Sequence, residues 1–382
     1  MSPEPFGIYV HWPFCAAKCP YCDFNSHVRS RIDDAGWVSG IVRELEYIAT
    51  MEGSSLPVVQ SIFFGGGTPS LMHGQSVGSV LDAIAKLWPM SSGVEITLES
   101  NPASADAERF RDYRIAGVNR LSLGVQALND ADLKALGRLH DVAEAKAALG
   151  LAMACFDRVS LDLIYARPQQ TVPQWRSELK EALAFGTDHL SLYQLTIEPM
   201  TPFATLARTG ALTIPDDDTA AALYETTQDL TDAAGIPAYE ISNHAKSGAE
   251  CRHNQLYWRY GDYAGVGPGA HGRLTLGERR MATSTERLPE RWRAKVEAEG
   301  HAFIEYAEVA REDAAREHLL MNLRLAEGLE LPGYESRWGI SLDRQRIAAL
   351  KCESMLEMRG DRLVATRSGR LVLNSVIAAL AD

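Results

Sequence analysis

The sequence predicts an α/β protein that is built on a parallel sheet and carries a small second domain at its C-terminal end. Two observations lead to this prediction. Strand-like and helix-like segments alternate six times up to about residue 235, and from about residue 305 the pattern changes to helices with a short hairpin. Six βα units imply a parallel sheet with right-handed crossovers. Their number fits a partial, open (β/α)6 barrel of the TIM type, but the alternation does not say whether the sheet closes.

Six short segments rich in β-branched and aromatic residues are the predicted strands. They lie near 6–11, 58–64, 93–99, 118–124, 157–165 and 188–197. Between them, apolar residues recur every three to four positions, as in amphipathic helices. The first such series is Trp37, Ile41, Leu45 and Ile48. In barrels of this kind the functional residues follow the carboxyl ends of the strands, so we expect them there.

The second half of the chain is less regular. Residues 236–304 form a connecting region rich in Gly, Tyr and His that leads into an Arg- and Glu-rich stretch. Helices are expected near 311–325 and 343–356, followed by a hairpin that turns at Gly360-Asp361 and by a closing helix. We therefore divide the chain into residues 1–235, 236–304 and 305–382.

Composition excludes several classes of protein. The chain has 382 residues, of which 46% are hydrophobic and 23% charged, as is usual for a globular protein. A net charge of −12 argues against nucleic acid as a partner, because phosphate binding needs a basic face. No apolar run is long enough to span a membrane and no signal peptide is visible, so we expect a cytoplasmic protein.

Half of the six cysteines lie in one short motif. Cys15, Cys19 and Cys22 follow the first predicted strand at C-x3-C-x2-C spacing. Three thiolates on so short a loop can hold three corners of a [4Fe–4S] cluster, which leaves one iron open to another ligand. A zinc site would need a fourth ligand and lacks the usual ribbon spacing. A chance group of buried cysteines is the remaining alternative.

Glycines follow the second predicted strand, in the sequence IFFGGGTPS. Here Gly66 and Gly67 remove side chains where the polar groups of another molecule could approach the strand backbone, and Thr68 adds a hydroxyl. A tight βα turn is the plainer explanation. The position one strand after the cysteine loop favours a ligand site.

Polar residues also end the next three strands. They are Glu99 in LESNP, Gln126 in LSLGVQ with Arg138 further along, and Asp162 in VSLDLIY. Any one of them could be a buried polar residue that neighbouring backbone groups satisfy. Together, at one edge of successive parallel strands, they favour a binding site.

These motifs resemble those of a known family. The run YVHWPFCAAKCPYCDF is similar to the radical S-adenosylmethionine (SAM) proteins, and within them to the oxygen-independent coproporphyrinogen III oxidase group with its heme-chaperone branch, HemW. The resemblance implies a radical SAM barrel, a winged-helix-like C-terminal domain, and SAM bound to the open iron through its amino and carboxylate groups.

The resemblance also implies roles for individual residues. Tyr9, Gly66 and Glu99 would contact the SAM molecule bound to the cluster. Room for a second SAM molecule would be lined by Tyr21, Gly67, Thr68, Gln126, Arg138 and Asp162. Whether this second site is occupied in the chaperone branch is left open.

Three features favour the chaperone branch over the oxidase. Phe24 stands where the oxidase has a further cysteine, and the first strand begins almost at Met1, without the segment that precedes it in the oxidase. HNQLYW matches the HNxxYW pattern of the heme chaperones. Imidazole is a common heme ligand, so His253 becomes the first candidate, with Cys251 and His271 as alternatives.

A group of arginines follows the HNxxYW motif. Its members are Arg273, Arg279, Arg280, Arg291 and Arg293. They could pair with heme propionates, but interspersed glutamates favour an exposed, salt-bridged helix face.

We therefore expect a heme chaperone that binds a [4Fe–4S] cluster, SAM and heme, takes an electron from a donor, and passes heme to an acceptor apoprotein. The alternative is an enzyme, an oxygen-independent coproporphyrinogen III oxidase that oxidatively decarboxylates propionate side chains. A third possibility is a cluster that only builds a docking surface, in which case SAM would not bind.

Overall fold

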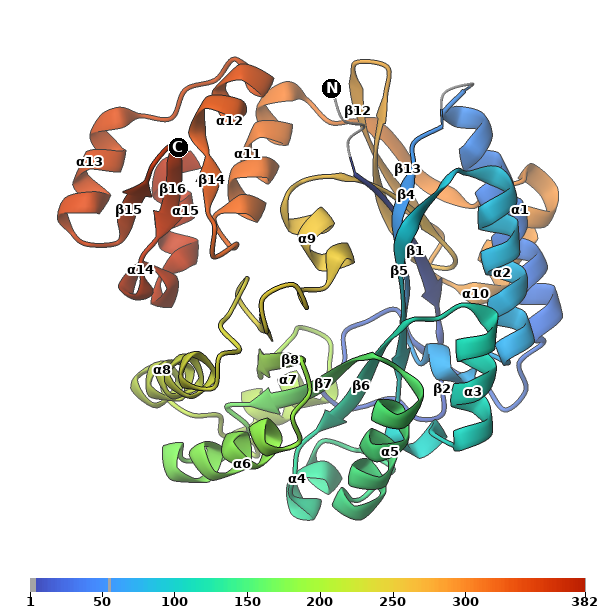
Figure 1. Ribbon diagram of the computed structural model, residues 1–382, viewed down its shortest axis with the longest axis horizontal. Coiled ribbons are helices and arrows are strands. Elements are labelled where there is room, and N and C mark those ends of the chain that lie inside the picture. Colours follow the sequence, from blue (N-terminus) through green and yellow to red (C-terminus); the bar gives the residue numbers. More distant parts are fainter. Residues whose placement is uncertain (1–4, 54–55, 382) are drawn as a thin grey trace.

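The computed structural model describes residues 5–53 and 56–381, and its main feature is a curved sheet of eleven strands (Figure 1). The order across the sheet is β13-β12-β11-β10-β1-β4-β5-β6-β7-β8-β9, so β13 and β9 form its two edges. The sheet is therefore an open barrel rather than a closed one.

Six adjacent parallel strands form the centre of this sheet. They are β1 (Phe6–Trp12), β4 (Val59–Gly66), β5 (Met90–Ser100), β6 (Arg120–Gln126), β7 (Arg158–Tyr165) and β8 (His189–Gln194). Each coincides with a predicted strand, and the predicted open (β/α)6 barrel is confirmed.

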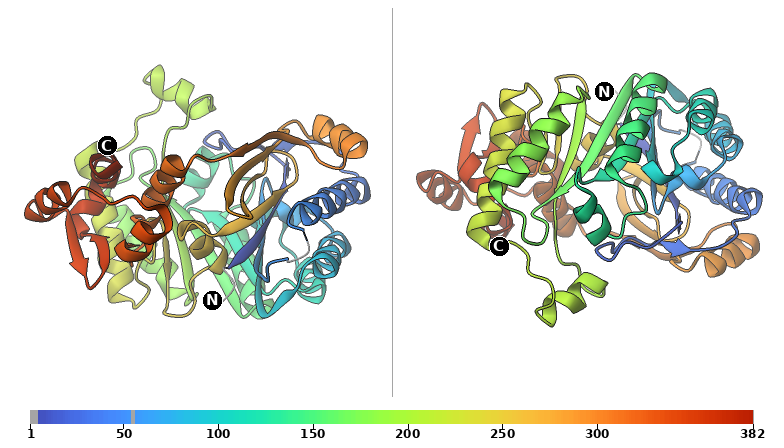
Figure 2. Two further views of the ribbon diagram at one scale, coloured as in Figure 1. Left: turned by 90° about the horizontal axis from the view of Figure 1, so that it is seen from above. Right: turned by 90° about the horizontal axis from the view of Figure 1, so that it is seen from below.

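Helices cover the outer face of these strands, as Figure 2 shows from above and below. They are α1 (Asp34–Met51), α2 (Gly74–Leu87), α3 (Ala107–Ala116), α5 (Val142–Cys155), α6 (Val172–Ala184) and α8 (Asp217–Ala233). Two shorter helices, α4 (Asp130–Ala135) and α7 (Pro202–Arg208), pack in a separate cluster through Leu133 and Phe203, and Figure 2 shows α7 projecting away from the layer of helices. In α1 the four apolar residues of the predicted series are all buried, as their spacing requires.

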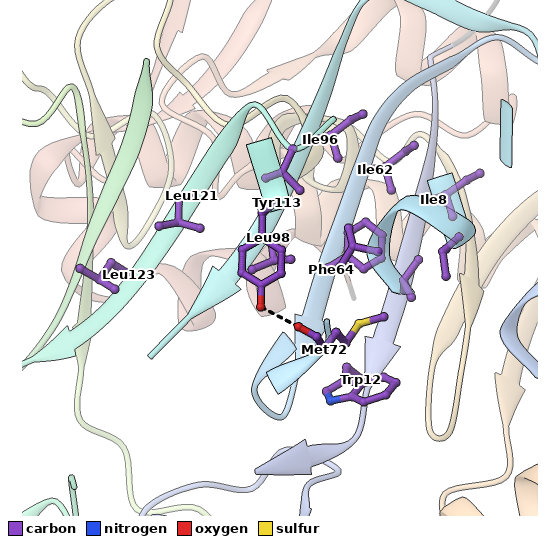
Figure 3. Close-up of a cluster of buried hydrophobic side chains, with 14 of the residues drawn as sticks. Ile8, Trp12, Ile62, Phe64, Met72, Ile96, Leu98, Tyr113, Leu121 and Leu123 are labelled. Carbon is purple, nitrogen blue, oxygen red and sulfur yellow. Dashed lines mark hydrogen bonds between the residues drawn. The ribbon is translucent and has the colours of Figure 1, made fainter. Parts of the chain in front are cut away.

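The core lies between the sheet and the helices. Figure 3 shows Ile8, Ile62, Phe64 and Leu98 projecting from neighbouring strands into one apolar cluster. All but a few per cent of these side chains is removed from water, and each such burial stabilises the fold by about 1.5–3 kcal/mol. This rigid layer holds the ends of the strands in place.

The connecting region continues the sheet, which the sequence pattern did not indicate. β10 (Asp262–Val266) runs parallel to β1, and β11 (His271–Leu276), β12 (Arg279–Thr285) and β13 (Phe303–Glu308) follow in antiparallel order. At the other edge, β9 (Asn243–Ala245) pairs with β8. Two helices complete the region, α9 (Arg252–Trp258) and α10 (Pro289–Glu299).

The arginine group does not lie on one helix face. Arg293 of α10 does form exposed ion pairs with Asp33 and Glu297. Arg273 lies on strand β11, Arg279 and Arg280 lie on β12, and only 5% of Arg280 is exposed. The prediction of a helix face is wrong for these three residues, because the hairpin that carries them could not be recognised from charge spacing.

A second core organises the C-terminal region. Its elements are α11 (Arg311–Asn322), β14 (Leu329–Glu330), α12 (Leu331–Trp338), α13 (Arg344–Cys352), β15 (Leu356–Arg359), β16 (Arg362–Ala365), α14 (Arg367–Leu371) and α15 (Leu373–Ala381). The predicted hairpin at Gly360 is β15–β16, which forms the wing beside the helices (Figure 1). None of the helices between residues 5 and 381, residues 54–55 aside, is long and apolar enough to cross a membrane.

Candidate cluster and cofactor site

A cavity of about 470 Å³ opens at the carboxyl ends of the parallel strands. Residues from the cysteine loop and from five strands, β4 to β8, line it together. Those singled out in the sequence are Cys15, Cys19, Tyr21, Cys22, Gly66, Gly67, Thr68, Glu99, Gln126, Arg138 and Asp162. Two other candidates, Tyr9 and His253, do not line it, but the rings of both stack on Phe63, which does. Parallel strands thus bring side chains that are distant in sequence to one edge, as expected.

The cysteine loop leaves the sheet after β1 and returns through a two-stranded parallel pair, β2 (Phe14–Cys15) and β3 (His27–Val28). Neighbours donate to two of its sulfur atoms: Thr68 Oγ1 to Cys15 Sγ at 3.3 Å, and Arg138 Nη1 to Cys19 Sγ at 3.6 Å. Burial raises the pKa of Cys15, which the hydrogen bond from Thr68 partly opposes. A bound cation would favour the thiolates outright.

This donor set fits an iron–sulfur cluster. The three thiols are unpaired, partly exposed, and face one cavity that has room for more than the cluster. Among the described residues no three Cys, His, Asp or Glu side chains converge as a single metal ion requires. Cysteines of a cubane each bind a different iron, so they need not converge on one point.

The glycine run packs against the cysteine loop. Gly67 N donates to Trp12 O at 2.7 Å and Thr68 N to Phe14 O at 2.8 Å. A Cβ atom at Gly67 would lie 2.7 Å from the carbonyl oxygen of Phe14, closer than packing allows. Gly67 therefore has no side chain because the backbone of the cysteine loop passes directly over it.

Glu99 is a buried carboxyl at the cavity wall. Its Oε2 accepts a hydrogen bond from Gly66 N at 3.2 Å. Burial, with a smaller contribution from Asp162, raises the pKa of Glu99 to about 8, which the Gly66 N–H and the positive charge of Arg120 partly oppose. A cationic ligand would favour the ionised form.

Arg120 was not singled out in the sequence, although it lines the same cavity. Its side chain is 2% exposed and its Nε atom has no hydrogen-bond partner among the described residues. The signal was a charged residue at the start of the apolar strand RLSLGVQ. A buried arginine of this kind offers a positive charge to an anionic group in the cavity.

Tyr9 reaches the cysteine loop through His11, a second residue that the sequence analysis passed over. The Tyr9 hydroxyl lies 3.1 Å from His11 Nδ1, and His11 Nε2 lies 2.9 Å from the carbonyl oxygen of Asn25. Burial lowers the pKa of His11 to about 4, so the ring is neutral. Because the carbonyl can only accept, Nε2 carries the proton and Tyr9 donates to Nδ1.

A turn in the connecting region holds the same loop. The side chain of Asn25 donates to Pro268 O and to Arg287 O, both at 2.8 Å. Gly267 and Gly269 have positive φ angles of 96° and 80°. A Cβ atom at Gly267 would clash with His11 O, and one at Gly269 with the Asn25 amide. We call residues 265–269 the glycine turn; it fastens the cysteine loop to the sheet extension.

Helix α9 carries the HNxxYW motif and is anchored to the inner face of the sheet. Glu95 on β5 accepts from Arg252 N at 2.8 Å and from Cys251 Sγ at 3.4 Å. The Nδ1 atom of His253 lies 3.0 Å from Ser61 Oγ, and its ring stacks on Phe63 with centroids 5.2 Å apart. Only 8% of His253 is exposed, and burial lowers its pKa to about 4.

The two alternatives to His253 differ in accessibility. Cys251 is completely buried, and burial raises the pKa of its thiol to about 12. It is therefore a thiol rather than a thiolate at neutral pH. His271 at the start of β11 is exposed.

A smaller cavity of about 200 Å³ lies on the other side of α9, against the C-terminal region. Tyr257 of the motif is 40% exposed and lines it, together with Tyr260, Tyr263, Arg273, Arg280, Glu317, Leu320 and Met321. Arg273 forms a bidentate pair with Glu317, at 2.9 and 3.1 Å. Asn254 of the same helix lines the large cavity, so α9 stands between the two.

Comparisons with known proteins agree with this arrangement. A family model of the radical SAM superfamily matches residues 9–182, and one of the HemN C-terminal domain matches residues 309–372. The heme chaperone HemW of Escherichia coli is 37% identical over 379 residues, covering 98% of this chain and 97% of that protein. HemW of Mycobacterium tuberculosis is 35% identical over 384 residues, covering 100% and 96%.

A mitochondrial relative and a solved structure are also similar. The mouse radical S-adenosyl methionine domain-containing protein 1 is 36% identical over 385 residues, covering 98% of this chain and 87% of that protein. The structure of coproporphyrinogen III oxidase (HemN) from Escherichia coli superposes with a TM-score of 0.82 at 20% identity, covering 99% of this chain and 90% of that one. At this identity the likeness shows a shared fold.

Proposed function

The chain belongs to the HemW family of radical SAM proteins, and from this we propose that it is a heme chaperone, which binds heme and transfers it to an acceptor protein. The observation that carries the proposal is the position of α9. The helix that bears HNxxYW lies between the cavity of the cysteine loop and the smaller cavity lined by Tyr257, where a ligand could contact both parts of the protein.

A [4Fe–4S] cluster would be held by Cys15, Cys19 and Cys22. When bound, it would supply an iron with an open position and a carrier for one electron. The SAM molecule bound to the cluster would lie with a positive group near Glu99, and the cavity beside Asp162 would offer room for a second SAM molecule. Tyr9 would be oriented by His11.

Heme would bind beside α9. In metal sites a ligating histidine usually donates its other ring N–H to a fixed acceptor. Ser61 Oγ, 3.0 Å from His253 Nδ1, can be that acceptor while α9 stays in place. After the outward shift that heme entry requires, another acceptor would replace it. Since His253 is largely buried, heme would reach it only if α9 shifts outward. Tyr257 and Tyr263, with ring centroids 5.6 Å apart, would offer aromatic faces to the porphyrin.

The proposal includes two protein partners, a donor that reduces the cluster and an acceptor of heme. Phe24, which is 61% exposed, lies at the rim of the large cavity, where a partner would approach the cluster. We also propose a reducing compartment such as the cytoplasm, because the six cysteines are unpaired.

The alternative function is the oxidase activity, because the chain shares its fold with the oxidase HemN. Phe24 argues against the oxidase activity, because the resemblance implies that the oxidase has a fourth cysteine at this position. An anaerobic assay of reconstituted protein with coproporphyrinogen III, SAM and a reductant separates the two functions. Formation of protoporphyrinogen would refute the chaperone proposal.

A heme titration tests the proposal directly. Cluster-reconstituted protein is titrated with heme under anaerobic conditions and followed by absorbance, and the loaded protein is then mixed with an apoprotein such as apomyoglobin. We expect saturable binding of one heme per chain and its passage to the apoprotein. Absence of saturable binding would sink the proposal.

A further inference from the structure

A chain of hydrogen bonds runs from the wall of the large cavity to the HNxxYW helix. It begins at Asp162, whose Oδ1 accepts from Ser160 Oγ at 2.7 Å. Ser160 Oγ lies 2.8 Å from His189 Nδ1, and His189 Nε2 lies 3.0 Å from the hydroxyl of Tyr239. The hydroxyl accepts from Asn254 Nδ2 at 3.2 Å. Asn254 is the second residue of HNxxYW.

The donors and acceptors of this chain all point one way. Ser160 uses its proton toward the Asp162 carboxylate, so its oxygen must accept from His189 Nδ1–H. Burial lowers the pKa of His189 well below its usual range, so the ring is neutral and Nε2 accepts from the Tyr239 O–H. Tyr239 then accepts from the amide of Asn254. Every hydrogen bond in the series is donated in the direction of Asp162, so the negative charge of Asp162 polarises all of them.

Ser160 and His189 in this series of hydrogen bonds are shielded from water, Tyr239 is half-buried, and both ends reach the cavity. Ser160 and His189 are 0% and 1% exposed, whereas Asp162 and Asn254 line the large cavity. A second serine, Ser122, donates to the other oxygen of Asp162 at 2.8 Å. Hydrogen bonds in such a buried network are strong and expensive to break.

We propose that His189 and Tyr239 are positioning residues that make the placement of the HNxxYW helix depend on what occupies the cavity at Asp162. The occupant is a cation such as SAM, whose sulfonium and ammonium groups are attracted to the carboxylate. When the cation binds Asp162, it neutralises the carboxylate that polarises these hydrogen bonds. The hydrogen bond between Asn254 and Tyr239 becomes weaker, and α9 can move.

This inference rests on the proposed function for its biological meaning, because α9 is the helix beside which we place heme. It deepens that proposal by making heme binding and SAM binding mutually dependent. By linkage, a ligand that shifts α9 changes heme affinity, and heme changes the affinity for that ligand by the same factor.

Hydrogen–deuterium exchange of α9 tests the inference without heme. Cluster-reconstituted protein is compared with and without saturating SAM, in the wild type and in Tyr239→Phe, which keeps the ring and removes only the linking hydroxyl. We expect SAM to change exchange of the amides of 252–258 by about 5-fold or more in the wild type, and by less than about 2-fold in the variant.

Two further variants sharpen this comparison. Ser160→Ala breaks the chain at another point with a small loss of volume, and it should uncouple α9 in the same way. Tyr224→Phe is the matched control, because it removes a buried hydroxyl that has no hydrogen-bond partner among the described residues. It should respond to SAM like the wild type.

Each outcome decides the inference. It is overturned if SAM leaves the exchange of α9 unchanged in the wild type, if Tyr239→Phe and Ser160→Ala respond like the wild type, or if Tyr224→Phe loses the response as well. If heme does not bind, the proposed heme-chaperone function is refuted. The coupling between SAM and α9 is a separate claim, and hydrogen–deuterium exchange still decides it. Where heme binds, SAM should change the dissociation constant of heme by about 5-fold or more. This change should be seen in the wild type and in Tyr224→Phe, whose hydrogen bonds from Asp162 to Asn254 are intact, and not in Tyr239→Phe or Ser160→Ala.

Discussion

The imidazole of His253 and the hydroxyl of Ser61 lie 3.0 Å apart, which joins the HNxxYW helix to the central strand β4. The ring is also stacked on Phe63, and a Cβ atom at Gly7 would come within 3.2 Å of it. His253 is therefore a fixed part of the inner face of the sheet, and any role in heme binding requires the helix to move.

His253→Ala should weaken heme binding by about 10-fold or more, since a ligand or its orientation is lost. It should also lower the free energy of unfolding by about 1–3 kcal/mol, because Ser61 loses a buried partner. Absorbance titration and thermal unfolding measure the two effects separately. His271→Ala, at an exposed histidine, is the control and should bind heme normally. If His271→Ala weakens heme binding and His253→Ala does not, the heme site lies at β11 instead.

Single Cys→Ser changes at Cys15, Cys19 and Cys22 should each remove most of the bound cluster, because the loop then offers only two thiolates. Iron and sulfide analysis after anaerobic reconstitution measures this loss. Cys352→Ser changes an exposed cysteine on α13 and should keep the full content. Equal iron content in all four variants would contradict the assignment of the cluster ligands.

The glycine turn should control how firmly the cysteine loop is held. Gly269→Ala places a Cβ atom against the Asn25 amide at a positive φ angle, and we expect a loss of about 2 kcal/mol or more in unfolding free energy and faster loss of iron to a chelator. Gly277→Ala is the matched control, because its φ is also positive, at 66°, but nothing lies within 4 Å. It should lose stability only, with normal iron retention. Equal rates of iron loss in both variants would show that the turn does not act on the loop.

SAM binding should strengthen as pH rises toward 8. Burial raises the pKa of Glu99 to about 8, so below that pH the free carboxyl is mostly protonated and binding of a cation must first remove the proton. The dissociation constant should therefore fall by at most about tenfold per pH unit between pH 6 and 8 and then level off. Equilibrium dialysis at several pH values measures it. Glu99→Gln reports the titration of the remaining groups, SAM and Asp162, so parallel curves for the two proteins would refute the role of Glu99.

Much of the fold could be predicted because its signals are local. The spacing of Trp37, Ile41 and Leu45 is set by the period of one helix, and β-branched runs mark the six central strands without reference to any other part of the chain. The cysteine motif is local as well, since three ligands on one loop of eight residues need no distant partner. The polar residues at the strand ends follow from the rule that parallel strands end at one edge.

The sequence by itself determined the six βα units, the C-terminal hairpin and the cysteine loop. Only the tertiary structure decided that β10 to β13 extend the sheet, that Asn25 is held by the turn at Pro268, and that His189 and Tyr239 join Asp162 to Asn254. The physical reason is the range of the interactions. Periodicity reports how one segment faces the core. These contacts join distant groups such as Asn25 and Pro268, which are 243 residues apart, and no local pattern encodes which groups will meet.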